Sequence, residues 1–133
     1  MQSFATPEDG YRSYREMWLR VALTISQSGR PVALFGSGEP DQWERCTGRA
    51  YFTQIHYLAL VCDDATLVER LRRRPAWRRA GTPEFIAEML KYNRALKENA
   101  HRTTPPMTLL DTTSISVAAS VQHVATWIRE RLP

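Results

Sequence analysis

The sequence lacks the long apolar run of roughly 18 residues that a membrane-spanning helix needs, and its N-terminus has no basic and apolar signal pattern. These absences predict a soluble protein of the cytoplasm with no membrane partner. Cysteine is also scarce. Cys46 and Cys62 form no CxxC motif and no His/Cys metal spacing, so we expect reduced thiols and no metal site.

The chain also has no GxxxxGK[ST] sequence, the motif of a phosphate-binding loop. Its glycine-rich turn, residues 36–40 (GSGEP), has no lysine near it, so we exclude a phosphate loop there. Histidine offers little more. His56 lies within an apolar run, where a core histidine is the more common explanation, and His101 and His123 lack metal-ligand spacing.

What the sequence does contain is enough apolar material for one folded domain. It has 133 residues, of which 43% are hydrophobic and 10% aromatic, with no low-complexity segment. This composition is typical of a globular chain that buries a core. The net charge of +4 favours anionic ligands. Because the excess is local to the arginine cluster, it allows nucleic acid as a partner without implying it, and we do not expect nucleic acid as the main ligand.

The positive charge is concentrated in residues 67–79 (LVERLRRRPAWRR). Six of the ten residues from Arg70 to Arg79 are arginine. Guanidinium groups stay charged and bind phosphate oxygens through two parallel hydrogen bonds, so the segment predicts a site for a phosphorylated ligand. The alternative is a solvated helix end whose cations offset the helix dipole. Trp77, within the segment, could stack on a nucleobase or anchor the loop to the core.

Hydrophobic periodicity predicts helices that alternate with buried strands. We expect a helix from Tyr11 to about Gly29, a strand over residues 32–35, a short helix or irregular crossover over 41–49, a strand over 55–62, a helix from Asp63 to Pro75, a helix from Pro83 to about Ala100, a strand over 107–110 and a closing helix with Val117, Val121, Val124, Ile128 and Leu132 on one stripe. This order predicts a three-layer α/β/α fold around a parallel sheet. Residues 55–62 and 107–110 should be parallel neighbours.

This succession resembles the C-terminal two-thirds of the P-loop nucleoside and nucleotide kinase superfamily. The resemblance rests on the strand that ends in Asp63-Asp64, the helix LVERLRRR, the excursion PAWRRAG, the helix EFIAEMLKYNRALKENA, and PPMTLLDTT before the last helix. It covers nearly the whole chain, through motifs of moderate specificity. It implies an ATP-dependent phosphotransferase that uses Mg2+ and a small-molecule acceptor, with a lid at about residues 72–82 within a single partial kinase-like domain, 1–133.

The resemblance also implies roles for particular residues. Arg70 and Arg74 would contact adenine and the phosphates, and Arg74, Arg78 and Arg79 would act on the transferring phosphoryl group. The remaining assignments complete the expected site: Asp111, Thr112 and Thr113 would line the adenine pocket, and Gly36, Ser37, Gly38, Glu39, Arg15 and Trp18 would lie on the acceptor side.

The chain departs from this family at one important point. The glycine-rich loop, its lysine and its magnesium-binding hydroxyl would lie on a first strand and helix before residue 1. We therefore expect either a truncated form that is inactive alone, which the matching lid and adenine loop favour, or a degenerate binder. A missing central strand would leave unpaired sheet edges, which favour association with another chain, including a homo-oligomer. The alternative function is a non-catalytic module that binds phosphate, nucleotide or nucleic acid.

Overall fold

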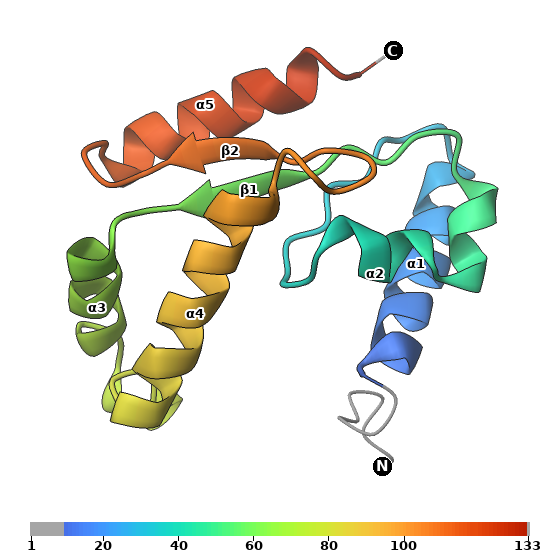
Figure 1. Cartoon of the computed structure of the whole chain (residues 1–133). Helices are drawn as coiled ribbons and strands as arrows, with labels where there is room; N and C mark the ends of the chain where they lie inside the picture. Colours follow the sequence, from blue (N-terminus) through green and yellow to red (C-terminus); the bar gives the residue numbers. More distant parts are fainter. Residues whose placement is uncertain (1–9, 133) are drawn as a thin grey trace. The chain divides into compact units, whose positions relative to one another are not determined.

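The chain has a mixed α/β structure, with five α-helices and a two-stranded parallel sheet in the part that is described (Figure 1). The structure is a computed structural model and describes residues 10–132. The chain divides into two compact units, residues 1–56 and residues 57–133. The predicted α/β class is confirmed at this level.

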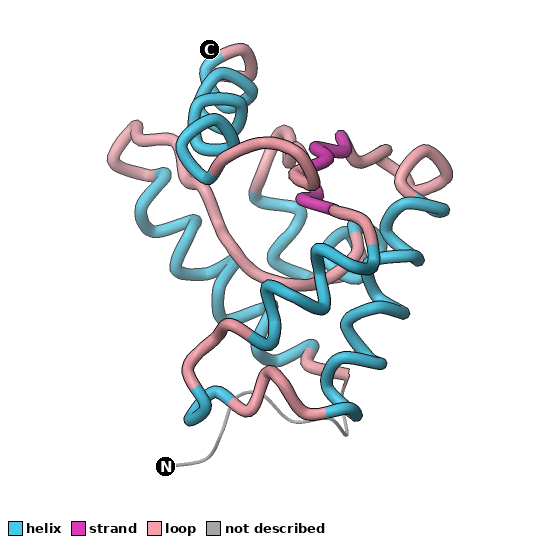
Figure 2. The backbone as a smooth tube through the Cα atoms, turned by 90° about the vertical axis from the view of Figure 1, so that its left-hand side faces the viewer, coloured by secondary structure: helices cyan, strands magenta, loops and turns pink. Residues whose placement is uncertain are grey.

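The second unit contains the sheet and three of the α-helices. Its elements are β1 (Leu58–Val61), α3 (Asp64–Arg72), the 3-10 helix η3 (Ala76–Arg78), α4 (Pro83–Asn99), β2 (Thr108–Asp111) and α5 (Val117–Arg129). The two strands run parallel, from the pair Leu58 and Thr108 to the pair Val61 and Asp111, and lie side by side in both ribbon views (Figure 2). The prediction of parallel neighbours is therefore confirmed, although β1 is shorter than expected.

Helix α4 covers one face of this sheet. Ala59 and Val61 of β1 are buried in one cluster with Leu96, Ala100 and Met107. Because successive strand residues point to opposite faces, Leu58 and Leu60 belong to the other face. There the indole Nε1 of Trp127, in α5, donates to Thr108 Oγ1, which pairs with Leu58 in the register (3.1 Å). Helices therefore lie on both faces of the strand pair.

The predicted helix boundaries in this unit are confirmed by their capping bonds. Asp63 accepts a hydrogen bond from Thr66 N (2.7 Å) and begins α3, which ends before Pro75. Thr82 Oγ1 accepts from Phe85 N, with Pro83 as the first residue of α4. A side-chain acceptor at this position satisfies a backbone N–H that has no partner inside the helix.

The closing helix is present as predicted, but its apolar stripe is only partly covered. Val117 is 82% exposed and Val121 is 57% exposed, while Leu60 on β1 is 51% exposed. Large apolar side chains that lie open in this way are typical of surfaces that associate with something else.

The first unit is helical in its described part. It contains α1 (Arg12–Ser26), α2 (Pro40–Glu44) and the 3-10 helix η2 (Thr47–Tyr51). The Glu16 carboxylate on α1 accepts hydrogen bonds from Thr47 N (2.5 Å) and Gly48 N (3.0 Å), which fixes the start of η2 against α1. Its buried apolar side chains include those of Leu19, Ala22, Pro40, Trp43 and Cys46.

The strand predicted over residues 32–35 is wrong. This segment is an exposed loop, in which Phe35 is 79% exposed. A strand needs a neighbour that accepts and donates its backbone hydrogen bonds, and the only strand pair in the described residues is β1 with β2. The apolar β-prone composition of this run was therefore insufficient to make it a strand.

Candidate functional site

The candidate site lies at the carboxyl ends of β1 and β2. Beyond the last pair of the register, Thr112 N donates to Val61 O (2.8 Å) and Asp63 N donates to Thr113 Oγ1 (2.8 Å). The two segments that follow the strands are thus joined to each other. In open α/β sheets, this edge is where ligands bind.

Arg70 connects helix α3 to this edge. Its guanidinium Nη1 donates to Thr112 Oγ1 (2.7 Å) and its Nη2 donates to Thr112 O (2.6 Å). The buried Thr112 hydroxyl in turn donates to Val61 O (3.1 Å). A hydroxyl has one proton to donate and lone pairs to accept with, so both contacts are satisfied together. Arg70 is therefore held against the loop for which the resemblance to kinases implied an adenine pocket.

Asp111 fixes the turn on the other side of Thr112. Its Oδ1 accepts from Thr113 Oγ1 (2.6 Å) and from Thr113 N (2.8 Å). The side-chain hydrogen bond from Thr113 has the largest effect on the pKa of Asp111, and the backbone hydrogen bond from Thr113 adds to it. Together they hold this pKa below its ordinary value. Arg70 and Lys97 act in the same direction through their charge. This carboxylate is therefore ionised at neutral pH.

Helix α4 approaches the end of β1 with two polar side chains that were not among the predicted site residues. Asn93 is buried, accepts from Cys62 N (3.3 Å) and donates through Nδ2 to Cys62 O (2.8 Å). Lys97 Nζ donates to the same carbonyl (2.9 Å). One signal was available: Asn93 interrupts the apolar stripe of this helix, and a polar group in such a stripe needs a hydrogen-bonded partner.

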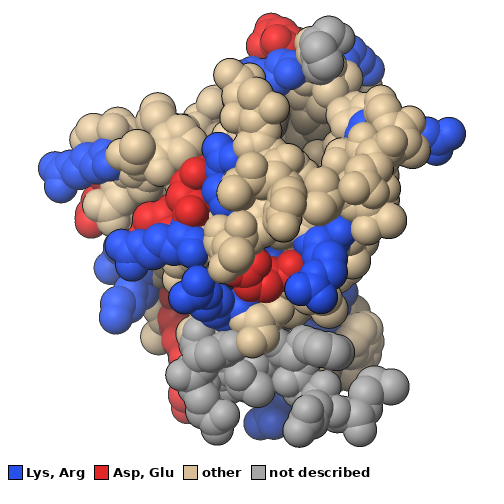
Figure 3. Space-filling view, turned by 90° about the vertical axis from the view of Figure 1, so that its right-hand side faces the viewer, with Lys and Arg blue, Asp and Glu red and all other residues tan. Residues whose placement is uncertain are grey.

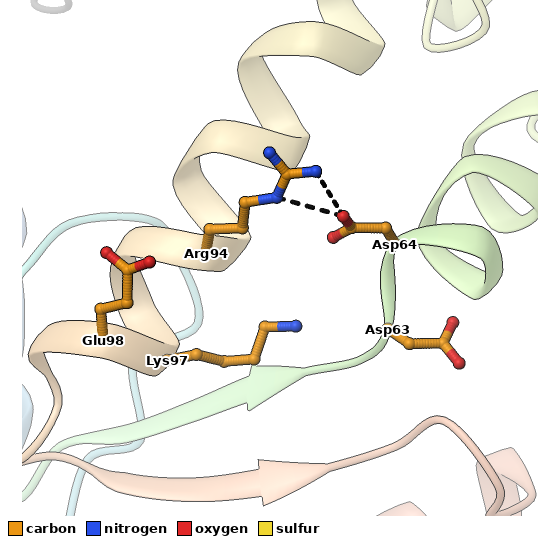
Figure 4. A pocket seen from close by; sticks show the side chains of 5 residues that line it. All are labelled: Asp63, Asp64, Arg94, Lys97 and Glu98. Carbon is orange, nitrogen blue, oxygen red and sulfur yellow. Dashed lines mark hydrogen bonds and ion pairs between the residues drawn. The ribbon is translucent and has the colours of Figure 1, made fainter.

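A shallow hollow of about 450 Å3 lies beside these groups, lined by Asp63, Asp64, Arg94, Lys97 and Glu98 (Figure 4). Arg94 forms an ion pair with Asp64, and the hydrogen bond from Arg94 lowers the pKa of Asp64. Glu98 points away from this pair. Because opposite charges already meet here, the hollow offers less attraction for an anion than the arginine segment does.

The other arginines proposed for ATP lie apart from the strand ends. Arg74, Arg78 and Arg79 are exposed, and none of the hydrogen bonds or ion pairs within residues 10–132 joins their side chains to residues 111–113. The guanidinium of Arg78 lies 5.3 Å from the centre of the Trp77 ring. Of the arginines expected at the site, the structure therefore brings only Arg70 to the loop after β2.

The residues expected on the acceptor side belong to the first unit. Gly36 and Ser37 are exposed loop residues. Gly38 has a φ of 132°, and a Cβ there would lie 2.8 Å from Trp43 Nε1, so packing accounts for this glycine. Glu39 caps α2, whose Gln42 side chain accepts from Glu39 N (3.0 Å).

Arg15 and Trp18 are half-buried on α1. The Arg15 Nε and Trp18 Nε1 atoms are buried and have no hydrogen-bond partner within the described part of the chain. Buried donors without a partner are uncommon and cost free energy. The acceptor-side assignment of both residues stays a prediction.

Comparison of the chain with protein-family models, with curated proteins and with solved structures gave no match. Within the described residues, no helix is both long and apolar enough to cross a membrane. The same residues contain no group of three or more His, Cys, Asp and Glu side chains placed to hold a metal ion. On the face shown in Figure 3, Lys and Arg side chains lie among acidic and uncharged ones.

Proposed function

We propose that this chain binds ATP at the strand ends of its second unit and serves an ATP-dependent phosphotransferase activity of the nucleoside or nucleotide kinase type. The observation that carries the proposal is the pair of hydrogen bonds from Arg70 to Thr112. They place a cation that is held in one orientation at the edge where parallel α/β sheets bind ligands. The proposed fold around this site is the three-layer arrangement of P-loop kinases.

The proposed roles follow from the chemistry of each group. Arg70 and residues 111–113 would surround adenine, because a guanidinium plane stacks on aromatic rings. The hydrogen bonds among these residues would hold the loop in place for the base. Arg74, Arg78 and Arg79 would move from solvent onto the phosphates when ATP binds. Mg2+ would come with the ATP phosphates, and no step of the proposal depends on a side chain that holds it.

In the transfer itself, the acceptor oxygen bonds to the γ-phosphorus while the bond to the β–γ bridging oxygen breaks, and the acceptor proton passes to solvent. Arginines stabilise the charge that develops on the phosphoryl oxygens. The sequence contains no lysine within a GxxxxGK[ST] motif to hold the β and γ phosphates. We therefore expect residues 1–133 alone to bind ATP weakly and to turn it over far more slowly than kinases usually do.

The test is calorimetric titration of the chain with ATP, GTP and tripolyphosphate. We expect saturable binding that prefers ATP and that weakens about tenfold in Arg70→Ala, because the variant loses the guanidinium that stacks on adenine, a contact worth up to about 2 kcal/mol when it is desolvated. Arg70→Lys should also bind poorly, since an ammonium cannot reproduce the two-pronged contact. Arg72→Ala is the matched control, an exposed arginine on the same helix.

Two further measurements make the result decisive. Thermal unfolding of each variant shows whether Arg70→Ala still folds, and Arg74→Ala tests the site through an exposed residue that is not part of the Thr112 contact. Equal binding of ATP and tripolyphosphate, or equal losses in Arg70→Ala and Arg72→Ala, would contradict an adenine site. Binding that ignores the base and falls steeply with salt would instead favour the non-catalytic alternative.

A further inference from the structure

The arginine segment presents an exposed aromatic ring that the proposed ATP site does not use. Trp77 lies in η3, between α3 and α4, and is 78% exposed. It therefore does not anchor the loop to the core, which was one of the two roles that the sequence left open. An exposed tryptophan among cations is typical of a surface that stacks on a flat ligand.

The loop that carries Trp77 is fixed at both ends. Leu71 and Ala80 are almost fully buried and belong to one cluster with Ile86 of α4. Between them, Arg78 N donates to Pro75 O (2.9 Å) and Arg79 N donates to Ala76 O (3.0 Å). We call residues 72–79 the Trp77 loop. Because its ends are anchored and its turn is hydrogen-bonded, the ring is presented to solvent with little conformational entropy left to lose on binding.

The charges of the Trp77 loop are largely unpaired. Arg73 forms an ion pair with Glu69 on the same helix. Four other arginines have no ion pair with any described residue and are exposed: Arg72, Arg74, Arg78 and Arg79. Four exposed guanidiniums beside one ring can contact several phosphates that are spread along a strand.

We propose that the Trp77 loop is a binding site for single-stranded nucleic acid, which shares Arg74, Arg78 and Arg79 with the proposed ATP site and differs from it in using Trp77 and not Arg70. A base stacks on the Trp77 ring, and the four arginines contact the phosphates on either side. The ring faces of bases are accessible in single strands and covered in duplexes, so the ring selects single strands. A flat anionic surface such as a membrane fits less well, because Trp77 is the only large apolar side chain in the loop.

The experiment measures fluorescence anisotropy of a labelled 15-nucleotide dT or U oligonucleotide with the full chain at several salt concentrations. We expect Trp77→Ala to weaken binding about tenfold or more, as the loss of one stacked base does. Trp77→Phe should retain most of the affinity. Phe35→Ala is the matched control, because Phe35 is exposed to the same degree as Trp77 but lies in the first unit.

The salt dependence tests the arginines separately. Each of Arg72→Ala, Arg74→Ala, Arg78→Ala and Arg79→Ala should lower the slope of log K against log salt by about 0.7, the value for one phosphate contact on a single strand. Arg102→Ala, an exposed arginine outside the loop, should leave the slope unchanged. These variants remove no buried group, so loss of folding is not expected, and thermal unfolding checks it.

Three results would overturn the proposal: equal affinity of Trp77→Ala and the unchanged chain, equal affinity for a duplex of the same length, or binding to anionic phosphatidylserine vesicles that depends on Trp77 more strongly than oligonucleotide binding does. Failure of the ATP proposal is seen independently, because Arg70→Ala should reduce ATP binding and leave oligonucleotide binding unchanged.

Discussion

Asn93 holds the chain at the point where it leaves β1. Its side-chain amide makes one hydrogen bond to each backbone group of Cys62 and is itself buried. A side chain that satisfies both backbone groups of one residue replaces a neighbouring strand at that position. Single hydrogen bonds of this kind have a modest net effect, but a buried group left without a partner is costly.

We therefore expect Asn93→Ala to lower the free energy of unfolding by about 1–3 kcal/mol, because the buried Cys62 N–H loses its partner. The Cys62 carbonyl loses one of its two donors and keeps Lys97 Nζ. Asn99→Ala, near the end of the same helix, is the control and should cost less than about 1 kcal/mol. Urea unfolding followed by circular dichroism measures both values. Equal stability of Asn93→Ala and the unchanged chain would show that water reaches Cys62.

The residues of the site differ in how far the sequence could predict them. Arg70 and Thr112 are 42 positions apart, and their proximity was predictable only through the expected parallel pairing of 55–62 with 107–110. Asn93 interrupts the apolar stripe of α4, which marks it as polar and in need of a partner, but the partner is the backbone of Cys62, which the sequence does not single out. The exposure of Trp77 was undecidable from sequence, since a tryptophan serves equally well as a core anchor or a stacking surface.

Helix α3 depends on the charge of the residue that caps it. Asp63 accepts a hydrogen bond from Thr66 N, and its interactions with Thr66 hold its pKa below the ordinary aspartate value. Asp64, in the first turn, has its pKa lowered by Arg94. A carboxyl group whose pKa is lower in the folded chain binds its proton less readily there than in the unfolded chain. Its contribution to stability is therefore complete above the unfolded pKa of about 3.9 and is lost as the pH falls through the lower folded value.

From this sign we expect the melting temperature to fall as the pH is lowered from 5 to 2, and to fall less steeply in Asp63→Asn. Asparagine keeps the capping acceptor and has no proton to gain. Glu98→Gln, on the exposed side of α4, serves as the control for removal of an acid. Identical acid profiles for Asp63→Asn and the unchanged chain would show that the cap does not contribute to the loss of stability in acid.

The helices were more predictable than the strands for a physical reason. A helix satisfies its hydrogen bonds within one segment, so local signals are sufficient to place its ends. Asp63 marks the start of α3, Thr82 marks the start of α4, and a glycine follows the end of α1. A strand requires another segment. The run at 32–35 has the composition of a buried strand and remains a loop, whereas 107–110 has a similar composition and pairs with β1.

At the scale of the molecule, the two units differ in how much core they contain. In the second unit, helix α4 contributes to two buried clusters, one with Ala59 and Val61 of β1 and one with Leu71 of α3. Strand β1 is in turn paired with β2. The first unit has fewer buried apolar side chains among its described residues, with no strand ladder. Regions with fewer buried contacts open at a lower free-energy cost than the rest of a structure.

One free cysteine is buried in each unit, and this gives a measurement of each unit's stability. Cys46 lies in the first unit and Cys62 in the second, and burial raises the pKa of both thiols. Alkylation requires the exposed thiolate, so neither should react quickly in the folded chain. With increasing urea, we expect Cys46 to become reactive at a lower concentration than Cys62. Mass spectrometry of the alkylated peptides measures both in one sample, and the variants Cys46→Ala and Cys62→Ala confirm the assignment. If both thiols became reactive at the same urea concentration, the two units would be unfolding as one cooperative structure.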